Sequence, residues 1–217
     1  MARILLAGAS GLVGREVLRQ ALADPRVDEV VTPARRPLAA DPKLRHVLVD
    51  FDAMPADADW WEVDAVICAL GTTIRDAGSR AAFRKVDLDY PLAVARHALA
   101  HGAATFVLTS ASGANADSPI FYSRTKGELE NSLRALGYGS LCLVRPGLLG
   151  GERERRRPLE HAGMKLLGAI GPLLPRRYRV VPAEQVAATL LHGALDAKPG
   201  TRIIESEETR GNAWKSR

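Results

Sequence analysis

The stretch Gly8-Ala9-Ser10-Gly11-Leu12-Val13-Gly14 decides the fold of this chain. It follows the apolar run 4–7, which is typical of a buried strand, and leads into residues 15–22, where apolar positions recur at helical spacing. A strand, a turn with three glycines and a helix form the usual entry to a dinucleotide-binding unit. We expect Gly8 to allow a tight turn, Gly11 to admit a pyrophosphate, and Gly14 to let helix and strand pack closely.

The end of this turn is also a candidate anion site. The helix that follows would offer free backbone N–H groups and roughly half a positive charge to phosphates, so Ser10, Leu12 and Val13 are candidate cofactor contacts. The spacing is G-x-x-G-x-x-G, and no Gly-Lys-Ser/Thr ends it, which argues against a P-loop for nucleoside triphosphates. The alternative is a glycine-rich turn that binds nothing; the flanking strand and helix disfavour it.

Length and composition indicate one ordinary domain. The 217 residues are 47% apolar, enough for one sizeable core, so we expect a single domain over residues 1–217. The N-terminus lacks a signal-peptide pattern, and no apolar run approaches the roughly 18 residues of a membrane span. Cys68 and Cys142 lie in apolar runs, which favours buried thiols in a reducing compartment, although a contact between them stays open. The prediction is a cytoplasmic protein with no membrane partner.

The charge balance favours an anionic small molecule. The chain has 30 basic and 25 acidic residues, a net charge of +5, and arginine runs at 153–157 and 176–179. Such a field suits a ligand like NADP and allows weak attraction to nucleic acid. The runs lack interleaved aromatic residues except Tyr178, so we expect solvated surfaces and no nucleic-acid partner.

The order of apolar runs predicts an α/β fold. Runs rich in Val, Ile and Leu, typical of strands covered on both sides, alternate with helical segments. The prediction is a doubly wound parallel sheet of about seven strands, a Rossmann fold, with helices on both faces. A region around 150–180 would form a small substrate lid, and Glu205–Arg217 would be peripheral. Strands are expected at 4–7, 27–32, 45–49, 65–70, 105–109, 141–144 and 201–204, and helices at 82–101, 119–136, 159–169 and 183–195.

Prolines and caps predict finer helix features. Pro91 falls inside the helix expected over 82–101, where it would mark a kink or a break into two helices. Ser118 is placed to cap a helix that begins at Pro119, and Gly137 follows the end of that helix.

The residues after the second strand predict which dinucleotide binds. NAD usually meets a carboxylate at this place, whereas this chain has Arg35 and Arg36. Two guanidinium groups can grip a 2′-phosphate, so the prediction is NADP; the alternative is a basic surface turn. Asp50, after the third strand, is a candidate partner of the adenine amino group. Leu70, Gly71 and Thr72, after the fourth strand, would pass along the adenosine side.

A Tyr122-x-x-x-Lys126 pair supplies candidate chemistry at the other end. The two residues are four apart on an expected helix, so they share one face, with Cβ atoms roughly 5–6 Å apart. A nearby ammonium group stabilises a phenolate, which suits a tyrosine to acid–base work. Ser110, just after the fifth strand, could polarise a substrate carbonyl while the tyrosine moves the proton. Ser112 is a competitor for that role, and an ordinary strand-end hydroxyl is the alternative.

These residues together resemble the short-chain dehydrogenase/reductase superfamily. The likeness is greatest to its atypical branch of Tat-interactive-protein-like oxidoreductases and covers roughly residues 3 to 196. Besides the glycine turn and Ser110, it rests on Cys68-Ala69-Leu70-Gly71-Thr72-Thr73, Val86-Asp87-Leu88-Asp89-Tyr90, the segment Tyr122–Glu130 and Arg145-Pro146-Gly147-Leu148-Leu149.

The resemblance implies an NADP-binding Rossmann fold with a Ser/Tyr/Lys site. Ser110 would orient the substrate, Tyr122 would be the acid/base, and Lys126 would hold the nicotinamide ribose. Pro146 and Gly147 would place backbone against the carboxamide. The relatives carry a second serine after the first, where this chain has Ala111, so one strand-end hydroxyl remains.

Several functions remain open on this resemblance. The first is NADP-dependent hydride transfer with a small carbonyl or alcohol substrate, and the main alternative is an NADP(H)-binding redox sensor or interaction protein without significant turnover. A third is an epimerase or dehydratase that uses the nicotinamide transiently. No metal is expected, and the chain could be a monomer or a homodimer.

Overall fold

The sheet confirms the expected fold class. The computed structural model describes residues 2–150 and 180–209. Seven strands form one sheet in the order β3-β2-β1-β4-β5-β6-β9, and every neighbouring pair is parallel. The strands are β1 (Ala2–Ala7), β2 (Val27–Ala34), β3 (Leu44–Leu48), β4 (Ala65–Cys68), β5 (Thr105–Thr109), β6 (Ser140–Arg145) and β9 (Gly200–Glu205).

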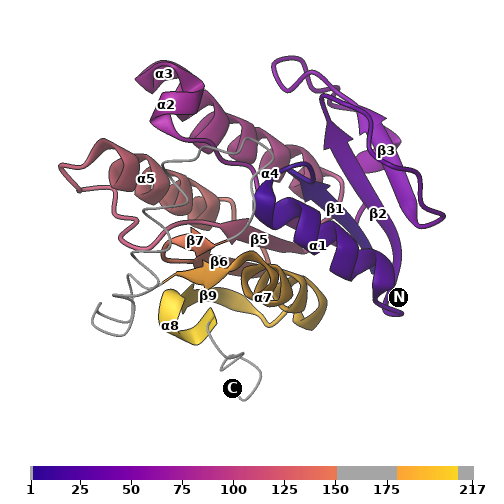
Figure 1. The fold of residues 1–217 in the computed structure, drawn as a ribbon. Helices are drawn as coiled ribbons and strands as arrows, with labels where there is room; N and C mark the ends of the chain where they lie inside the picture. Colours follow the sequence, from indigo (N-terminus) through magenta and orange to yellow (C-terminus); the bar gives the residue numbers. More distant parts are fainter. Residues whose placement is uncertain (1, 151–179, 210–217) are drawn as a thin grey trace.

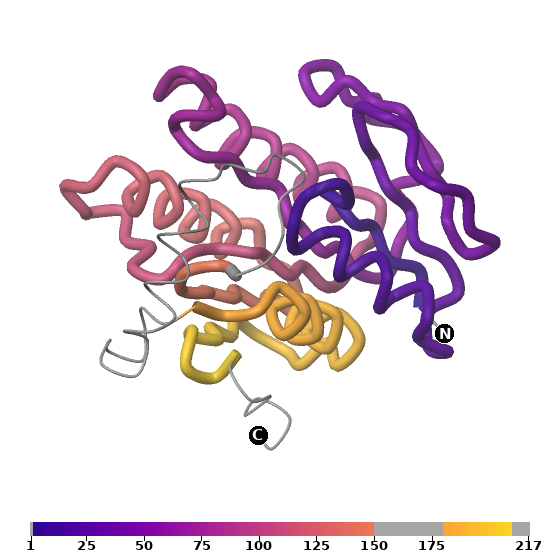
Figure 2. Tube along the Cα trace, viewed as in Figure 1, coloured from indigo at the N-terminus to yellow at the C-terminus, as the bar shows by residue number. Residues whose placement is uncertain are grey.

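Helices cover both faces of this sheet (Figure 1). The helices α1 (Leu12–Ala23) and α7 (Ala183–Asp196) pack against one another on one face. The helices α4 (Tyr90–Ala100) and α5 (Phe121–Ala135) lie together on the other. Figure 2 shows the chain starting in the indigo strand β1, inside the sheet, and reaching the yellow edge strand β9 near its end. The architecture is therefore a doubly wound Rossmann fold.

Each strand divides its side chains between two apolar cores. Ile4 and Leu6 of β1 pack with α1 and α7, whereas Leu5 packs on the opposite side with α4 and α5, as the period of two in a strand requires. Cys68 belongs to the α4/α5 core and Cys142 to the α1/α7 core, and both are free thiols. Burial raises the pKa of each thiol to about 11. The open question of a contact between the cysteines is thus settled, because the sheet separates them.

The strand order reverses beside β1, and this sets the position of the site. From β1 the chain first builds outward to β2 and β3, and then returns to place β4 on the other side of β1. In open α/β sheets a crevice forms where the order reverses, outside the carboxyl ends of the strands. The glycine turn leaves β1 at that end.

The helix expected over 82–101 is interrupted before Pro91. It begins as α3 (Arg80–Arg84), passes through the π-helical turn η2 (Lys85–Asp89) and continues as α4. Pro91 has no N–H to donate to the carbonyl of Asp87, which an unbroken α-helix would require. The chain accommodates this with wider turns, so the expected break is present as a π-helical segment.

The helix expected from Pro119 begins two residues later. The first residue of α5 is Phe121, and the Ser118 hydroxyl accepts a hydrogen bond from the Ile120 N–H at 3.1 Å. Ser118 therefore closes a turn before the helix and does not cap it, which corrects the expectation.

Short elements complete the described fold. Residues 205–209 are not peripheral as expected, because Ser206 and Thr209 of α8 are fully buried. The expected helix 159–169, the arginine runs and nearly all of the expected lid fall outside the described residues. The remaining elements are η1 (Asp59–Trp61), α2 (Ile74–Ala77), the parallel pair β7 (Leu149–Gly150) and β8 (Val181–Pro182), and α8 (Ser206–Thr209).

Candidate functional site

The glycine turn has the geometry that its sequence predicts. Gly8 has φ +91°, in the left-handed region, and a Cβ there would lie 2.7 Å from the Ala69 carbonyl carbon. A Cβ on Gly14 would lie 2.0 Å from the Gly8 oxygen, so only glycine lets α1 start this close to β1. Gly11 is the N-cap of α1 and gives the helix no side-chain cap. The N–H groups of the first turn are thus left for another acceptor.

A cavity of about 720 Å³ lies at the carboxyl ends of the central strands. It runs from the glycine turn, past the loop after β4, to the start of α5 and the Pro146–Gly147 turn after β6. It brings together most of the predicted residues of both halves of the site. These are Ser10, Gly11, Leu12, Val13, Leu70, Gly71, Thr72, Ser110, Ser112, Tyr122, Lys126, Pro146 and Gly147.

Five predicted cofactor residues are not part of this cavity lining. Gly8 and Gly14 shape the glycine turn from beneath, and the other three are Arg35, Arg36 and Asp50. Arg35 and Arg36 follow the last residue of β2, and their side chains are exposed. Asp50 is also exposed, and its carboxylate accepts a hydrogen bond from the Asp52 N–H at 2.9 Å. The roles proposed for these residues at the adenine end therefore stay predictions.

Lys126 is buried in an ion pair with Asp87, a residue that no sequence motif assigned to the site. Its Nζ lies 2.7 Å from Oδ1 of Asp87, and both side chains are at most 4% exposed. The other oxygen of Asp87 accepts from the Thr72 N–H at 2.8 Å. The π-helical turn η2 thus places a carboxylate between the loop after β4 and helix α5.

The charge of Lys126 is stabilised by this partner. Burial is the largest single effect and disfavours the ammonium form, but the attraction and hydrogen bond of Asp87, together with the attraction of Tyr122 and Cys68, outweigh it, so the pKa of Lys126 is raised above its usual value. Gly71 faces the pair, and a Cβ there would lie 3.5 Å from the Asp87 carboxylate and 3.8 Å from the ammonium group. Glycine at this position leaves the pair open toward the cavity.

Tyr122 lies at the mouth of the same cavity. Its side chain is 37% exposed, and its ring packs against Phe83 of α3 with centroids 5.6 Å apart. One helical turn further along α5 stands Lys126, whose ammonium form the tyrosine also favours electrostatically. Both residues therefore line one cavity, with the tyrosine on the open side and the lysine on the buried side.

Ser110 is held by a buried carboxylate. Its hydroxyl donates to Glu130 of α5 at 2.6 Å, and Glu130 also binds Arg145 at the end of β6 through contacts of 2.6 and 2.9 Å. Arg145 in turn reaches Glu205 at 3.0 Å, and the pKa of its guanidinium is raised chiefly by the bond to Glu130. This network joins the ends of three neighbouring strands beneath the cavity.

Asp87 and Glu130 are the site residues that the sequence reasoning missed. Glu130 follows Tyr122 and Lys126 at successive steps of four, so helical spacing alone could have placed it on the same stripe. Asp87 lies in the resembling segment 86–90, but no spacing relates it to Lys126, because its position depends on the π-helical turn.

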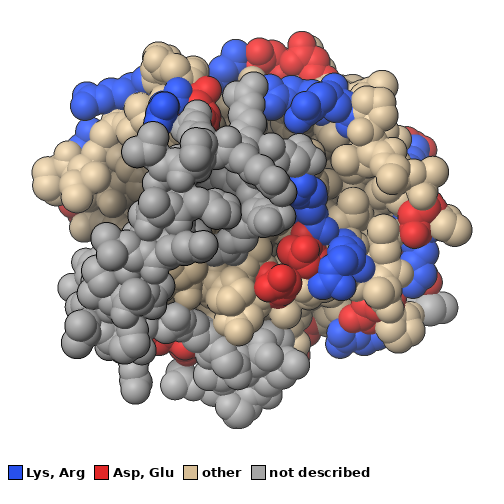
Figure 3. All heavy atoms as spheres, in the orientation of Figure 1, with Lys and Arg blue, Asp and Glu red and all other residues tan. Residues whose placement is uncertain are grey.

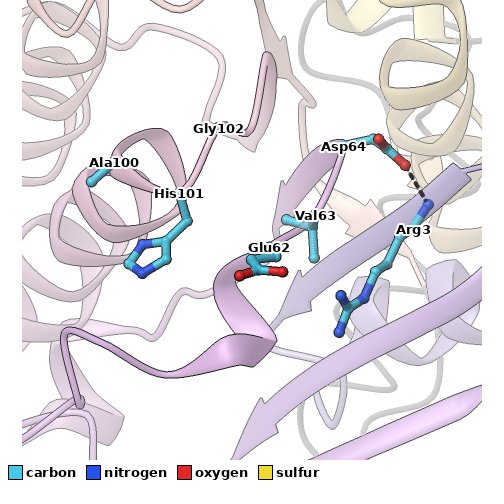
Figure 4. Close-up of a pocket in the computed structure, with 7 residues that line it drawn as sticks. All are labelled: Arg3, Glu62, Val63, Asp64, Ala100, His101 and Gly102. Carbon is cyan, nitrogen blue, oxygen red and sulfur yellow. Dashed lines mark hydrogen bonds between the residues drawn. The ribbon is translucent and has the colours of Figure 1, made fainter.

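A second cavity, of about 650 Å³, lies at the opposite ends of the strands (Figure 4). Its polar groups are largely engaged: the Arg3 N–H donates to Asp64 at 2.7 Å, and the Arg3 guanidinium pairs with Glu29. The His101 ring contacts the His97 carbonyl oxygen at 2.8 Å. None of the predicted site residues lines this cavity, so the chemistry is assigned to the carboxyl-end cavity.

The described part of the chain carries no membrane-spanning helix and no metal-binding cluster. On the face in Figure 3, acidic and basic side chains are interspersed on the side where α1 and β2 lie. Within residues 2–150 and 180–209, no helix is both long and apolar enough to cross a bilayer. The same ranges contain no group of three His, Cys, Asp or Glu side chains arranged to hold a metal ion.

Fold and site together define a dinucleotide-binding domain of the Rossmann type. Comparison with known families agrees: residues 8–192 match the NAD(P)H-binding family, and the chain belongs to it, as an atypical member of the short-chain dehydrogenase/reductase type.

Named relatives cover most of the chain. Protein fmp52, mitochondrial, of Emericella nidulans is 36% identical over 181 residues, which are 79% of this chain and 77% of the relative. Protein HTATIP2 of Rattus norvegicus is 31% identical over 212 residues, 95% and 86% of the two chains. Neither name states a reaction.

Solved structures show the same fold at low identity. MoeE5 in complex with UDP-glucose and NAD superposes with a TM-score of 0.71 at 15% identity, covering 95% of this chain and 79% of that one. The PhqB reductase domain from Penicillium fellutanum gives a TM-score of 0.67 at 21% identity, covering 93% and 66%. At these identities the likeness concerns the fold alone.

The comparisons correct one expectation. A cytoplasmic location was predicted, but the Fmp52 relatives, 31–36% identical, are named as mitochondrial proteins. The prediction rested on the lack of a signal-peptide pattern and on two apolar cysteine sites. Neither feature distinguishes the cytoplasm from another reducing compartment, so the cytoplasmic prediction is wrong.

Proposed function

We propose that this protein is an NADP-dependent oxidoreductase that transfers hydride between the nicotinamide and a small carbonyl or alcohol substrate. The observation that carries the proposal is one continuous cavity, lined by the glycine turn at one end and by Tyr122 and Lys126 at the other. A dinucleotide is a two-ended ligand, and this cavity offers an anion-binding helix start and an acid–base pair to its two ends.

The turn itself fits a pyrophosphate. A Cβ on Gly11 would meet only the Gly8 oxygen, at 3.4 Å, so the packing of the protein does not by itself exclude a side chain there. Because residue 11 has no side chain, space is left in the cavity beside the uncapped first turn of α1. Ser10, Leu12 and Val13 would contact the phosphates, and Pro146 and Gly147 would contact the carboxamide.

Tyr122 and Lys126 divide the chemistry in this proposal. The Tyr122 hydroxyl, on the open side, would give a proton to the substrate oxygen in reduction and take it in oxidation. Lys126 would hold the ribose hydroxyls and favour the phenolate, and Asp87 would keep the lysine charged and in place. The nicotinamide supplies or accepts the hydride when bound.

The test of this reaction is the Tyr122→Phe variant. NADPH oxidation is measured with a panel of aldehydes, ketones and quinones, and NADPH affinity is measured by calorimetry. Since a positioned acid–base group contributes roughly 10²–10⁴-fold, kcat should fall at least about 100-fold while the Kd for NADPH stays within about twofold.

Tyr138→Phe is the matched control. Tyr138 is buried and donates to the Ala95 carbonyl at 2.6 Å, remote from the cavity lining. Its variant loses a hydrogen bond but should retain kcat at temperatures where it stays folded. Near-normal turnover of Tyr122→Phe would refute the proposed role.

The proposed preference for NADP rests on Arg35 and Arg36. Both guanidinium groups are exposed after β2, and residues 33–37 contain no carboxylate to accept a ribose hydroxyl. Their double replacement by alanine should weaken NADPH binding by about 10- to 100-fold, because charge-assisted hydrogen bonds to the phosphate are lost.

NADH is the internal control for this variant. Its affinity should change by less than about threefold, since it carries no 2′-phosphate. Equal losses for NADPH and NADH, measured by calorimetry at one salt concentration, would contradict the assignment.

One observation favours a second function, binding of NADP(H) without turnover. The Lys126–Asp87 pair has no net charge, and the Ser110 hydroxyl donates to Glu130, so the lysine and this serine are both engaged by carboxylates. A redox-state sensor would need only the binding half of the site. Tight NADPH binding with no hydride exchange across the whole carbonyl panel would favour this reading.

A further inference from the structure

The hydroxyl groups of Ser110 and Ser112, which follow β5, differ in whether they can donate a hydrogen bond to a substrate. Glu130 makes contacts with Arg145 at 2.6 and 2.9 Å and with Arg134 at 3.2 Å. Guanidinium groups only donate, so both Glu130 oxygens act as acceptors here, and Oε1 accepts from the Ser110 hydroxyl as well as from Arg145. The single proton of the Ser110 hydroxyl must therefore point at Glu130. Ser110 has no proton left to donate to a substrate oxygen.

The acceptor of the Ser110 hydroxyl lies on α5 more than two helical turns beyond Tyr122. Glu130 lies eight residues beyond Tyr122 on α5, which corresponds to roughly 12 Å along the helix axis. Ser110 is bonded at the far end of this stripe, and it is 5% exposed.

Ser112 lies where the missing donor is needed. Its N–H donates to the Pro146 carbonyl at 3.0 Å, which fixes it beside the turn after β6. Three residues on, the Asn115 N–H donates to the Ser123 carbonyl at 3.0 Å, which ties the same loop to the start of α5 next to Tyr122. Ser112 thus stands between the Pro146–Gly147 turn and the tyrosine, and it lines the cavity.

We propose that Ser112 is the catalytic hydroxyl that donates to the substrate oxygen, and that Ser110 is a structural anchor committed to Glu130. The assignment rests on the proposed oxidoreductase function and names the group that works with Tyr122 in it. In the reduction, Ser112 would stabilise the negative charge that develops on the carbonyl oxygen before the Tyr122 proton reaches it.

The experiment compares Ser110→Ala, Ser112→Ala and the control Ser132→Ala. Ser132 lies on α5, where its hydroxyl donates to the Glu128 carbonyl at 2.9 Å. For each variant kcat and KM are measured with NADPH and the most active carbonyl of the panel, at a temperature where all are folded. Removal of one oxyanion donor should lower kcat of Ser112→Ala by about 100-fold with KM within threefold, whereas Ser110→Ala keeps kcat within about threefold.

Thermal unfolding gives a second reading that does not depend on activity. Ser110→Ala leaves a buried carboxylate short of one donor, so its Tm should fall by about 3–8 °C. Ser112→Ala should match the wild type within about 1 °C. A Tm loss in Ser112→Ala as large as in Ser110→Ala, or a kcat loss in Ser110→Ala as large as in Ser112→Ala, overturns the assignment.

Failure of the two proposals can be told apart. A wild type that reduces no carbonyl of the panel refutes the oxidoreductase function, and the catalytic assignment of Ser112 falls with it. A wild type that is active, with Ser112→Ala retaining kcat within threefold, refutes the Ser112 assignment alone.

Discussion

Asp87 controls the electrostatics of the site through a single contact. It is 1% exposed and lies 2.7 Å from the Lys126 ammonium group, with Thr72 closing its other oxygen. A buried ammonium group that loses its partner carboxylate is left uncompensated, and the loss is typically about 3–5 kcal/mol. The variant Asp87→Asn isolates this effect because it keeps the shape of the side chain and removes its charge.

The Asp87→Asn variant should become less stable and newly dependent on pH. In the wild type the pKa of Lys126 is raised, so its stabilisation is complete below the unfolded value of about 10.4 and is lost only as pH rises through the folded value. In the variant, burial without a carboxylate lowers this pKa below the unfolded value. The unfolded chain then binds more protons, and stability should rise with pH between the two values.

Chemical unfolding at pH 6–9 measures this difference. Between pH 6 and 9 the unfolding free energy of the wild type should not change with pH on account of Lys126. That of Asp87→Asn should increase toward pH 9. Asp89→Asn is the matched control, because Asp89 lies on the same π-helical turn with an exposed side chain. A flat profile for Asp87→Asn would show that the carboxylate does not set the charge of Lys126.

At the scale of elements, α5 connects the site to the loop after β5. Tyr122, Lys126 and Glu130 form one stripe of this helix, and Gly127 lets the loop cross it. A Cβ on Gly127 would lie 2.1 Å from the Ala116 nitrogen and 2.2 Å from the carbonyl carbon of the residue before it. The helix therefore holds the loop that carries Ser112 through a close backbone contact.

The substitution Gly127→Ala should push this loop off the helix. The gain in helix propensity is about 1 kcal/mol, but forcing backbone atoms apart costs more, so we expect a net loss of about 2 kcal/mol in unfolding free energy. Urea unfolding followed by circular dichroism measures the loss. Gly139→Ala is the control, since its Cβ would be in ordinary contact, 3.5 Å from the Ala104 oxygen, and should change stability by less than about 0.5 kcal/mol. Equal stability of the two variants would contradict the close contact.

At the scale of the whole molecule, the sequence predicted the sheet better than the site. Alternating apolar runs and helical segments identify the Rossmann fold, because parallel strands are buried on both faces and the glycine turn allows few other geometries. The strand order confirms this fold. The helix boundaries near Pro91 and Ser118 differ from those expected from the sequence. They depend on which backbone N–H and carbonyl groups find hydrogen-bond partners nearby.

The cavity lining was predictable from motifs that each lie on one segment, whereas the carboxylates that hold Lys126 and Ser110 from other segments were not. Tyr122 and Lys126 are related by helical spacing, and the structure brings both to the cavity. Asp87 reaches Lys126 from another segment, and Glu130 captures Ser110 from below the sheet end. No local pattern encodes these pairings, because they arise only when η2, α5 and the end of β5 are packed together.

Because both cysteines are buried, we expect the native protein not to react with thiol reagents. Cys68 and Cys142 are the full thiol content of the chain, both are fully buried, and each pKa is about 11. Alkylation requires an accessible thiolate, so a reagent can act only on chains in which a core has opened. Because the sheet places one thiol in each core, the order in which they become labelled shows which face of the sheet opens first.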